Sequence, residues 1–295
     1  MRGARPHGAI EQAVQRDGII RRGERVVVAC SGGADSIALV AALHAVANPM
    51  ELSLSIAHVN HGTRRSAWQD ECVALRIAAT FELPIDVVAL DAAPDNESEL
   101  RNRRYAVIAD VARRRGAGVV ATAHHAEDQS ETVLMALFRG AGPEGLTGMA
   151  PRRSLAEGIE LARPLLRFPA AELLAYCHAE GLPYAVDPTN ADDDRRRNAV
   201  RSALDALRPL FPGLDEAVAR AAHLIGDETR EPERAELRRR VRERLAQEDT
   251  LRDVDFTHVE AAVRALESGS SGSFYMKAGI RLEIEHGAIA GITKA

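Results

Sequence analysis

The chain has 295 residues, of which 46% are hydrophobic and 27% are charged. These proportions exclude a disordered or collagen-like chain, and the length corresponds to roughly two domains of about 150 residues each. The 38 basic and 43 acidic side chains leave a net charge of -5, which excludes a uniformly basic nucleic-acid coat.

Cysteine usage and hydropathy indicate the compartment. Cys30, Cys72 and Cys177 are the only cysteines, and no Cys-x-x-Cys pair occurs. Their odd number and wide spacing predict neither a disulfide framework nor a zinc ribbon, so we expect a reducing cytoplasm. No window approaches 18 apolar residues, so no membrane-spanning helix is expected. His58 and His61 have zinc-ligand spacing, but without a second pair zinc is the weaker interpretation.

Strand and helix patterns alternate through the first two thirds of the chain. The predicted strands cover residues 25–30, 52–59, 85–90 and 119–123. The predicted helices cover residues 34–46, 66–80, 97–115 and 127–138. Short apolar strands separated by helices of this length are typical of βαβ units, so we predict an α/β fold with a doubly wound parallel sheet. Ligands bind such sheets at the carboxyl ends of the strands.

The pattern changes after Gly140, and changes again near Pro212-Gly213. The later predicted elements are a helix at 170–180, charged helices at 214–225 and 231–247, and a hairpin-like alternation between 274 and 284. We therefore expect a catalytic domain at 1–213 and a small, mainly helical domain at 214–295.

The segment Ser31-Gly-Gly-Ala-Asp-Ser36 lies between a predicted strand and a predicted helix. Backbone N–H groups and the positive end of the helix hold an anion at such a place, and paired glycines let the backbone approach it closely. No lysine follows, as it would in a loop that serves γ-phosphate cleavage. Asp35, at the helix start, is the candidate for orienting phosphates or holding Mg²⁺. A tight turn with capping serines is the structural alternative.

This loop resembles the SGGxDS signature of the N-type ATP pyrophosphatases, and further motifs resemble those of the tRNA(Ile)-lysidine synthetases. They run in the family's order between about residues 24 and 210. The motifs are His58-Val-Asn-His-Gly-Thr-Arg64, Arg101-Asn-Arg-Arg-Tyr105, Thr122-Ala-His-His-Ala-Glu-Asp-Gln-Ser-Glu-Thr132, Arg139-Gly140, Gly145-Leu-Thr-Gly-Met149, Arg163-Pro-Leu-Leu166 and Asp187-Pro-Thr-Asn190. Glu127 stands where the family commonly has Asp, and Leu100 where it usually has Ala. Neither departure removes a charge.

The resemblance implies ATP-dependent ligation of free L-lysine to the wobble cytidine of an isoleucine tRNA with a CAU anticodon. The cytosine oxygen would attack the α-phosphate of ATP and release pyrophosphate, and the lysine amine would then displace AMP. Mg²⁺ is the expected metal because it neutralises phosphate charge. A tRNA-thiolating enzyme of the same class and a non-catalytic nucleotide-binding protein are the alternatives, and a homodimer stays open.

The resemblance also assigns residues to roles. The catalytic candidates are Asp35, His124, Asp128 and Glu131, with Asp35 and Asp128 as metal ligands. The ATP-binding candidates are Ser31, Gly32, Gly33, Ala34, Asp35, Ser36, His58, Asn60, Arg101 and Arg104. The tRNA-binding candidates are Arg139, Arg197 and Arg201. Ordinary helix-terminal acids, a structural histidine pair and solvated arginines are the alternative interpretations.

Two further sets of side chains are candidates for RNA contacts. Tyr105, Phe138 and Phe168 are the rings on which a splayed base would stack. The second domain, 214–295, is expected to position the tRNA. Several of its arginines could meet phosphate while others pair with nearby glutamates, among them Arg234, Arg238, Arg239, Arg240 and Arg242.

Overall fold

The structure is a computed structural model that describes residues 8–60, 67–90, 97–185, 195–230, 232–246, 256–275 and 280–294. The chain divides into two compact units, Met1–Ala222 and His223–Ala295. The division falls inside helix α8 (Leu214–Arg230), whereas the sequence pattern predicts a boundary just before this helix.

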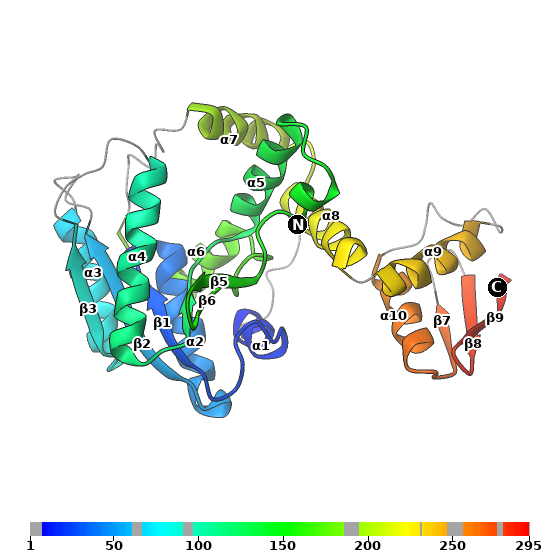
Figure 1. Cartoon of the computed structure of the whole chain (residues 1–295), viewed down its shortest axis with the longest axis horizontal. Helices are drawn as coiled ribbons and strands as arrows, with labels where there is room; N and C mark the ends of the chain where they lie inside the picture. The colour runs from blue at the N-terminus through cyan, green and yellow to red at the C-terminus, as the bar shows by residue number, and fades with distance from the viewer. Residues whose placement is uncertain are drawn as a thin grey trace. The chain divides into compact units, whose positions relative to one another are not determined.

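The first unit is built on a six-stranded sheet with the order β3-β2-β1-β4-β6-β5 (Figure 1). Its strands are β1 (Arg25–Ala29), β2 (Ser53–Asn60), β3 (Ile85–Ala89), β4 (Val119–Ala121), β5 (Arg152–Ala156) and β6 (Ile159–Ala162). All neighbouring strands are parallel except β5 and β6, which are antiparallel. The predicted doubly wound parallel sheet is confirmed, and the β5–β6 hairpin is an addition that the sequence pattern did not predict.

Helices cover both faces of this sheet. The flanking helices are α1 (Ala9–Arg16), α2 (Ala34–Met50), α3 (Ala67–Thr80), α4 (Glu97–Arg115) and α6 (Ala170–Ala179). Val26 and Val28 of β1 belong to the core beneath α1, α2, α3 and α6, whereas Val27 belongs to the core beneath α4. The strand's continuous apolar run is therefore explained by burial on both faces.

Three further elements of the first unit lie beyond the sheet's central strands. They are helix α5 (Ala126–Phe138), the short 3₁₀ helix η1 (Pro143–Thr147) and helix α7 (Arg195–Leu207). The side-chain amide of Gln129 on α5 binds the backbone of Met149, with Met149 N–H donating over 2.7 Å and Met149 C=O accepting over 3.2 Å. This pair of bonds joins two of the sequence motifs.

The second unit combines helices with a three-stranded antiparallel sheet, β7-β8-β9. Its complete elements are α9 (Pro232–Ala246), α10 (Phe256–Glu267), β7 (Gly272–Tyr275), β8 (Ile280–Glu285) and β9 (Ala288–Lys294). Ile280, Leu282 and Ile284 alternate inward from β8 onto the helices, as the period of a half-buried strand requires. No helix in the described parts of the chain is long and apolar enough to cross a membrane.

Arg238 is fully buried in the second unit, where it donates to Glu260 over 2.5 Å and to Asp227 over 2.9 Å. Arg234 donates to the same Glu260 over 2.9 Å. Of the two roles left open for these arginines, Arg238 therefore has the second: it lies inside the second unit and pairs with acidic side chains.

Candidate active site

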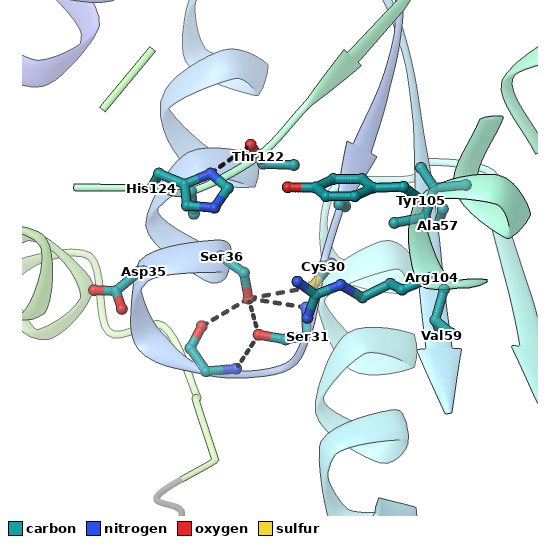
Figure 2. Close-up of a pocket in the computed structure, with 14 residues that line it drawn as sticks. Cys30, Ser31, Asp35, Ser36, Ala57, Val59, Arg104, Tyr105, Thr122 and His124 are labelled. Carbon is teal, nitrogen blue, oxygen red and sulfur yellow. Dashed lines mark hydrogen bonds between the residues drawn. The ribbon is translucent and has the colours of Figure 1, made fainter. Parts of the chain in front are cut away.

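A cavity of about 210 Å³ opens at the carboxyl ends of the central strands (Figure 2). The chain leaves β1 toward β2 and β3 on one side, whereas β4 lies on the other side, so the cavity sits where the strand order reverses. Its lining comprises Ala29, Cys30, Ser31, Gly33, Asp35, Ser36, Ala57, Val59, Arg104, Tyr105, Ile108, Thr122, Ala123 and His124. Six of the predicted site residues are among them.

The loop between β1 and α2 requires glycine at position 32. Gly32 has φ +96°, and a Cβ there would lie 2.7 Å from the backbone oxygen of Asp70. Gly33 is extended and caps α2 without any side-chain hydrogen bond to the helix's first N–H groups. N–H groups at the start of a helix, together with the positive end of its dipole, are suited to bind an anion.

The two serines of the loop are joined to each other. The buried Ser36 hydroxyl donates to Gly33 C=O over 2.8 Å and accepts from Ser31 N–H over 3.2 Å. The Ser31 hydroxyl donates to Ser36 Oγ over 3.1 Å. These bonds fix the loop's shape before any ligand binds.

Three contacts support the loop from outside it. His58 donates from Nδ1 to Cys30 C=O over 2.8 Å, Cys177 donates from Sγ to Ala34 C=O over 3.3 Å, and Ala185 N–H donates to Gly32 C=O over 2.9 Å. His58 is 2% exposed and does not line the cavity, so its observed contact is with the loop's backbone. The role of its motif in ATP binding stays a prediction.

His124 reaches the cavity from the end of β4, and its Nδ1 lies 2.9 Å from the Thr122 hydroxyl (Figure 2). Burial lowers the pKa of His124 well below its usual value, and the nearby charges of Arg163, Arg101 and Arg104 lower it further. The imidazole is therefore neutral at pH 7 and presents one protonated and one unprotonated nitrogen.

His125, unlike His124, is positively charged at pH 7. Its Nδ1 donates to Glu127 over 2.9 Å, while its Nε2 lies 3.7 Å from Asp35 and 3.5 Å from Asp128. Burial opposes the charge, but the hydrogen bond to Glu127 and the carboxylates of Asp128 and Asp35 outweigh it and raise the pKa of His125 to about 9. For Asp35, burial is the main cause of a raised pKa.

The two predicted metal ligands converge on one point. Asp35 and Asp128 lie 3.7 and 3.5 Å from Nε2 of His125, so both carboxylates face the same positively charged ring. Mg²⁺ binds through one or two carboxylates completed by phosphate oxygens and water, so these residues fit it. Within the described ranges, no group of three His, Cys, Asp or Glu side chains offers a metal site of its own.

Glu127, the first departure from the family motif, has two hydrogen-bond partners. Besides holding His125, its carboxylate accepts Ala170 N–H over 3.0 Å at the start of α6. The glutamate thus connects the starts of α5 and α6 and does not line the cavity.

Glu131 lies outside the cavity lining, buried between α5 and α7. Arg197 donates to it over 2.8 Å, and Arg201 donates to it over 2.7 Å and 3.2 Å. Burial raises the pKa of this carboxyl, but the two arginines outweigh it, so the pKa is lowered. A predicted catalytic residue and two predicted tRNA contacts therefore form one ion-pair cluster.

The other candidates are placed as follows. Asn60 donates to Glu71 over 2.9 Å, and Arg139 is exposed at the end of α5. Phe168 is fully buried, so its predicted contact with a base is wrong, whereas Phe138 is 70% exposed. The motif residues 61–64 and 187–190 lie outside the described residues, as do residues 192–194 of the charge run.

A family model and curated relatives match the larger part of the chain. The family model described as a PP-loop domain matches residues 7–207. The tRNA(Ile)-lysidine synthase of Symbiobacterium thermophilum is 39% identical over 232 residues, which cover 75% of this chain and 48% of that protein. The enzyme of the same name from Salinispora arenicola is 40% identical over 233 residues, covering 77% of this chain and 70% of that protein.

The chain spans about half the length of the first of these relatives. Among solved structures, the U34-tRNA thiolase NcsA of Methanococcus maripaludis, described with its [4Fe-4S] cluster, has a TM-score of 0.62. It is 19% identical, and the match covers 74% of this chain and 78% of that one. That likeness shows the shared fold alone.

Proposed function

Because the chain belongs to the PP-loop family, and within it to the tRNA(Ile)-lysidine synthases, we propose that it ligates lysine to the wobble cytidine of a CAU-anticodon isoleucine tRNA. The observation that carries the proposal is the cavity in which the Ser31–Ser36 loop, a neutral His124 and Asp35 meet. Family membership already implies the use of ATP.

In the first step, O2 of the cytosine bonds to the α-phosphorus of ATP, and the bond to the bridging oxygen breaks. That oxygen keeps the electron pair and leaves with pyrophosphate. The amides at the start of α2 and the hydroxyls of Ser31 and Ser36 would hold phosphate oxygens, where negative charge grows. With Nδ1 accepting from the Thr122 hydroxyl, Nε2 of His124 would carry the ring proton and would donate to a phosphoryl oxygen.

Asp35 and Asp128 are the residues that we propose for Mg²⁺, which would supply neutralisation of phosphate charge when bound. When Mg²⁺ binds, the ring of His125 would either move away from the two carboxylates or remain near the ion as a second positive charge. Its contact with Glu127 is independent of that space, since it uses the other ring nitrogen.

In the second step, the ε-amine of lysine bonds to C2 of the cytosine, and the bond between C2 and the oxygen that carries AMP breaks, its electron pair leaving with AMP. The proton that the amine loses would pass to a carboxylate beside it. Asp128 is the carboxylate that we propose for the amine, because the carboxylate of Glu131 is already engaged by Arg197 and Arg201. Glu131 would then act by holding these arginines where α7 meets the RNA.

The tRNA contacts in this proposal are Arg139, Arg197 and Arg201, with further phosphate contacts from the second unit.

The enzyme would work in a reducing cytoplasm, where the exposed Cys72 stays a thiol. The proposal includes a homodimer, which sedimentation velocity of the chain tests.

One assay tests the function directly. The protein is incubated with unmodified isoleucine tRNA, Mg-ATP and labelled lysine, and the label on the tRNA and the nucleotide products are measured. The proposal expects labelled tRNA together with AMP and pyrophosphate. Release of ADP and phosphate, or transfer of sulfur in place of lysine, would contradict it.

A further inference from the structure

Tyr105 lines the cavity and carries a polar atom that the structure leaves unsatisfied. The residue lies on α4 and is 8% exposed. Its hydroxyl is buried and forms no hydrogen bond of ordinary geometry with any residue that the structure describes. A buried hydroxyl without a partner is unfavourable, because it has lost its hydrogen bonds to water. In a cavity, such a group indicates a ligand that supplies the missing bond.

The surroundings of Tyr105 leave its hydroxyl, rather than its ring, for a ligand. The guanidinium carbons of Arg101, Arg104 and Arg153 lie 5.6, 5.7 and 5.7 Å from the centre of the ring. These arginines interact favourably with an aromatic face. A base that stacked on Tyr105 would have to compete with them for the ring.

The neighbouring side chains determine the chemistry of the missing partner. A guanidinium has five N–H donors and no acceptor, so none of these arginines can accept the phenolic hydrogen. Burial lowers the pKa of Arg163, whereas its interaction with Tyr105 raises that pKa. A hydrogen bond from Arg163 would go to the phenolic oxygen and would still leave the phenolic hydrogen without an acceptor. The missing partner is therefore an acceptor, and the positive charges around it favour an anionic oxygen.

The hydroxyl of Tyr105 points toward the ring of His124 (Figure 2). Because Nδ1 of His124 is bonded to the Thr122 hydroxyl, Nε2 is the ring nitrogen left for a ligand. Both residues line the cavity together with Ser31 and Ser36 of the loop. An oxygen bound beside the loop would therefore accept hydrogen bonds from α4 and from the end of β4.

We propose that Tyr105 is a further catalytic residue, whose hydroxyl donates a hydrogen bond to a non-bridging oxygen of the α-phosphoryl group during adenylation. The inference rests on the proposed function and adds a residue to its first step. The bond from phosphorus to the pyrophosphate oxygen breaks, the bond to O2 of the cytosine forms, and Tyr105 keeps its proton throughout. A donor that is in place before the reaction stabilises the transition state without reorganisation. The same contact would hold the phosphate of AMP.

The α-carboxylate of lysine is the other anion that takes part in the reaction. Asp128, which we propose for the lysine amine, does not line the cavity, whereas Tyr105 lines it together with the phosphate loop. The hydroxyl is therefore assigned to the phosphoryl group. A contact with the lysine carboxylate is an outcome that the test distinguishes.

The test uses Tyr105→Phe, which removes the hydroxyl and keeps the ring among the arginines. Release of pyrophosphate from ATP, with tRNA and without lysine, reports on the first step alone. Its kcat should fall on the order of 100-fold, while the KM for ATP rises no more than about 10-fold. The control is Tyr184→Phe, since the Tyr184 hydroxyl is bonded to Nε2 of His178 over 2.7 Å and lies outside the cavity lining. This variant should keep the normal rate.

A binding measurement gives a readout that needs neither tRNA nor lysine. Calorimetric titration with AMP should show binding to the unaltered chain and to Tyr184→Phe. Tyr105→Phe should bind AMP about 5- to 10-fold more weakly, as the loss of one hydrogen bond predicts, and should bind adenosine with unchanged affinity. AMP carries no pyrophosphate, so the difference reports on the α-phosphoryl group.

Thermal unfolding separates a catalytic hydroxyl from a structural one. Without ligand, Tyr105→Phe should melt at the same or a higher temperature than the unaltered chain, because it removes a buried hydroxyl that has no partner. A lower melting temperature, normal pyrophosphate release with normal AMP affinity, or a rise in the KM for lysine alone would overturn the inference. AMP binding that depends on Tyr105, without any lysine ligation, would instead contradict the proposed function alone.

Discussion

Nδ1 of His125 donates a hydrogen bond to Oε2 of Glu127 over 2.9 Å, so a protonated imidazole is held among acidic side chains at the edge of the cavity. The same ring faces Asp35 and Asp128 with its other nitrogen. The electrostatics of the candidate metal position therefore depend on whether this histidine is charged.

The first prediction concerns the pH dependence of stability. The folded pKa of His125, about 9, lies above the ordinary value of 6.5, so its charge stabilises the fold fully below pH 6.5. That contribution, on the order of 3 kcal/mol, is lost as the pH rises from 6.5 through 9. Urea unfolding at a series of pH values should show this decline, and His125→Gln should flatten it. An equal decline in the variant would contradict the assignment.

The second prediction concerns the ion-pair cluster between α5 and α7. Glu131→Gln leaves Arg197 and Arg201 without their buried carboxylate, so we expect a loss of about 3–5 kcal/mol in the free energy of unfolding. Glu99→Gln is the control, because its pair with Arg103 is solvent-exposed and contributes less than about 1 kcal/mol. Chemical denaturation of the two variants measures the difference. Equal losses would show that the cluster does not stabilise the contact between these helices.

The third prediction concerns the proposed magnesium ligands. Asp35→Asn and Asp128→Asn should each lower the rate of AMP formation by a factor on the order of 100 or more and raise the Mg²⁺ concentration needed for half-maximal rate. Asp110→Asn, which alters an exposed carboxylate paired with Arg113, should leave both quantities unchanged. Near-normal turnover with unchanged Mg²⁺ dependence in either variant would remove that residue from the site.

The fourth prediction concerns the glycine pair of the loop. Gly32→Ala places a methyl group 2.7 Å from Asp70 C=O at a positive φ, which should cost about 3 kcal/mol of stability and abolish ATP binding. Gly33→Ala adds its methyl group no closer than 3.6 Å to any other group, so its stability should change by less than about 1 kcal/mol. Thermal unfolding and nucleotide titration distinguish the two. Equal tolerance at both positions would contradict the requirement for glycine at position 32.

The fifth prediction concerns the second unit. Truncation after Arg230 keeps all of α8, including Asp215, which pairs with Arg208 over 2.8 Å. ATP affinity should stay the same, whereas tRNA affinity should fall and lose part of its salt dependence. Titrations at several salt concentrations test this. An unchanged affinity and salt slope would mean that the second unit makes no phosphate contacts.

The sequence predicts the first four strands well because each has an apolar run. In β1, β2 and β4 this run is buried on both sheet faces, whereas β3, at the sheet edge, is only partly buried. The prediction fails for β5, whose short sequence includes Arg152, Arg153 and an exposed Ser154 at the sheet edge. Polar edge strands lack the apolar pattern from which a strand is recognised. The missed strand is also the one that carries Arg153 to Tyr105.

The sequence predicts only part of the candidate site. The loop is local, so its glycines and serines are visible as a motif. Glu131 pairs with Arg201, which lies 70 positions away in the sequence. Helix and strand periodicities relate only residues a few positions apart, so they do not predict this pair. Similarly, the contact of Glu127 with Ala170 becomes visible only in three dimensions. The predicted roles of these residues in catalysis stay predictions.

The bond from Ala185 N–H to Gly32 C=O has a consequence for sequence change in the chain. Because it joins main chain to main chain, any residue except proline at position 185 can preserve it. Side chains there are free to vary while the link to the loop persists. Ala185→Pro should therefore impair ATP binding, whereas Ala185→Ser should not. Ala185 itself does not line the cavity.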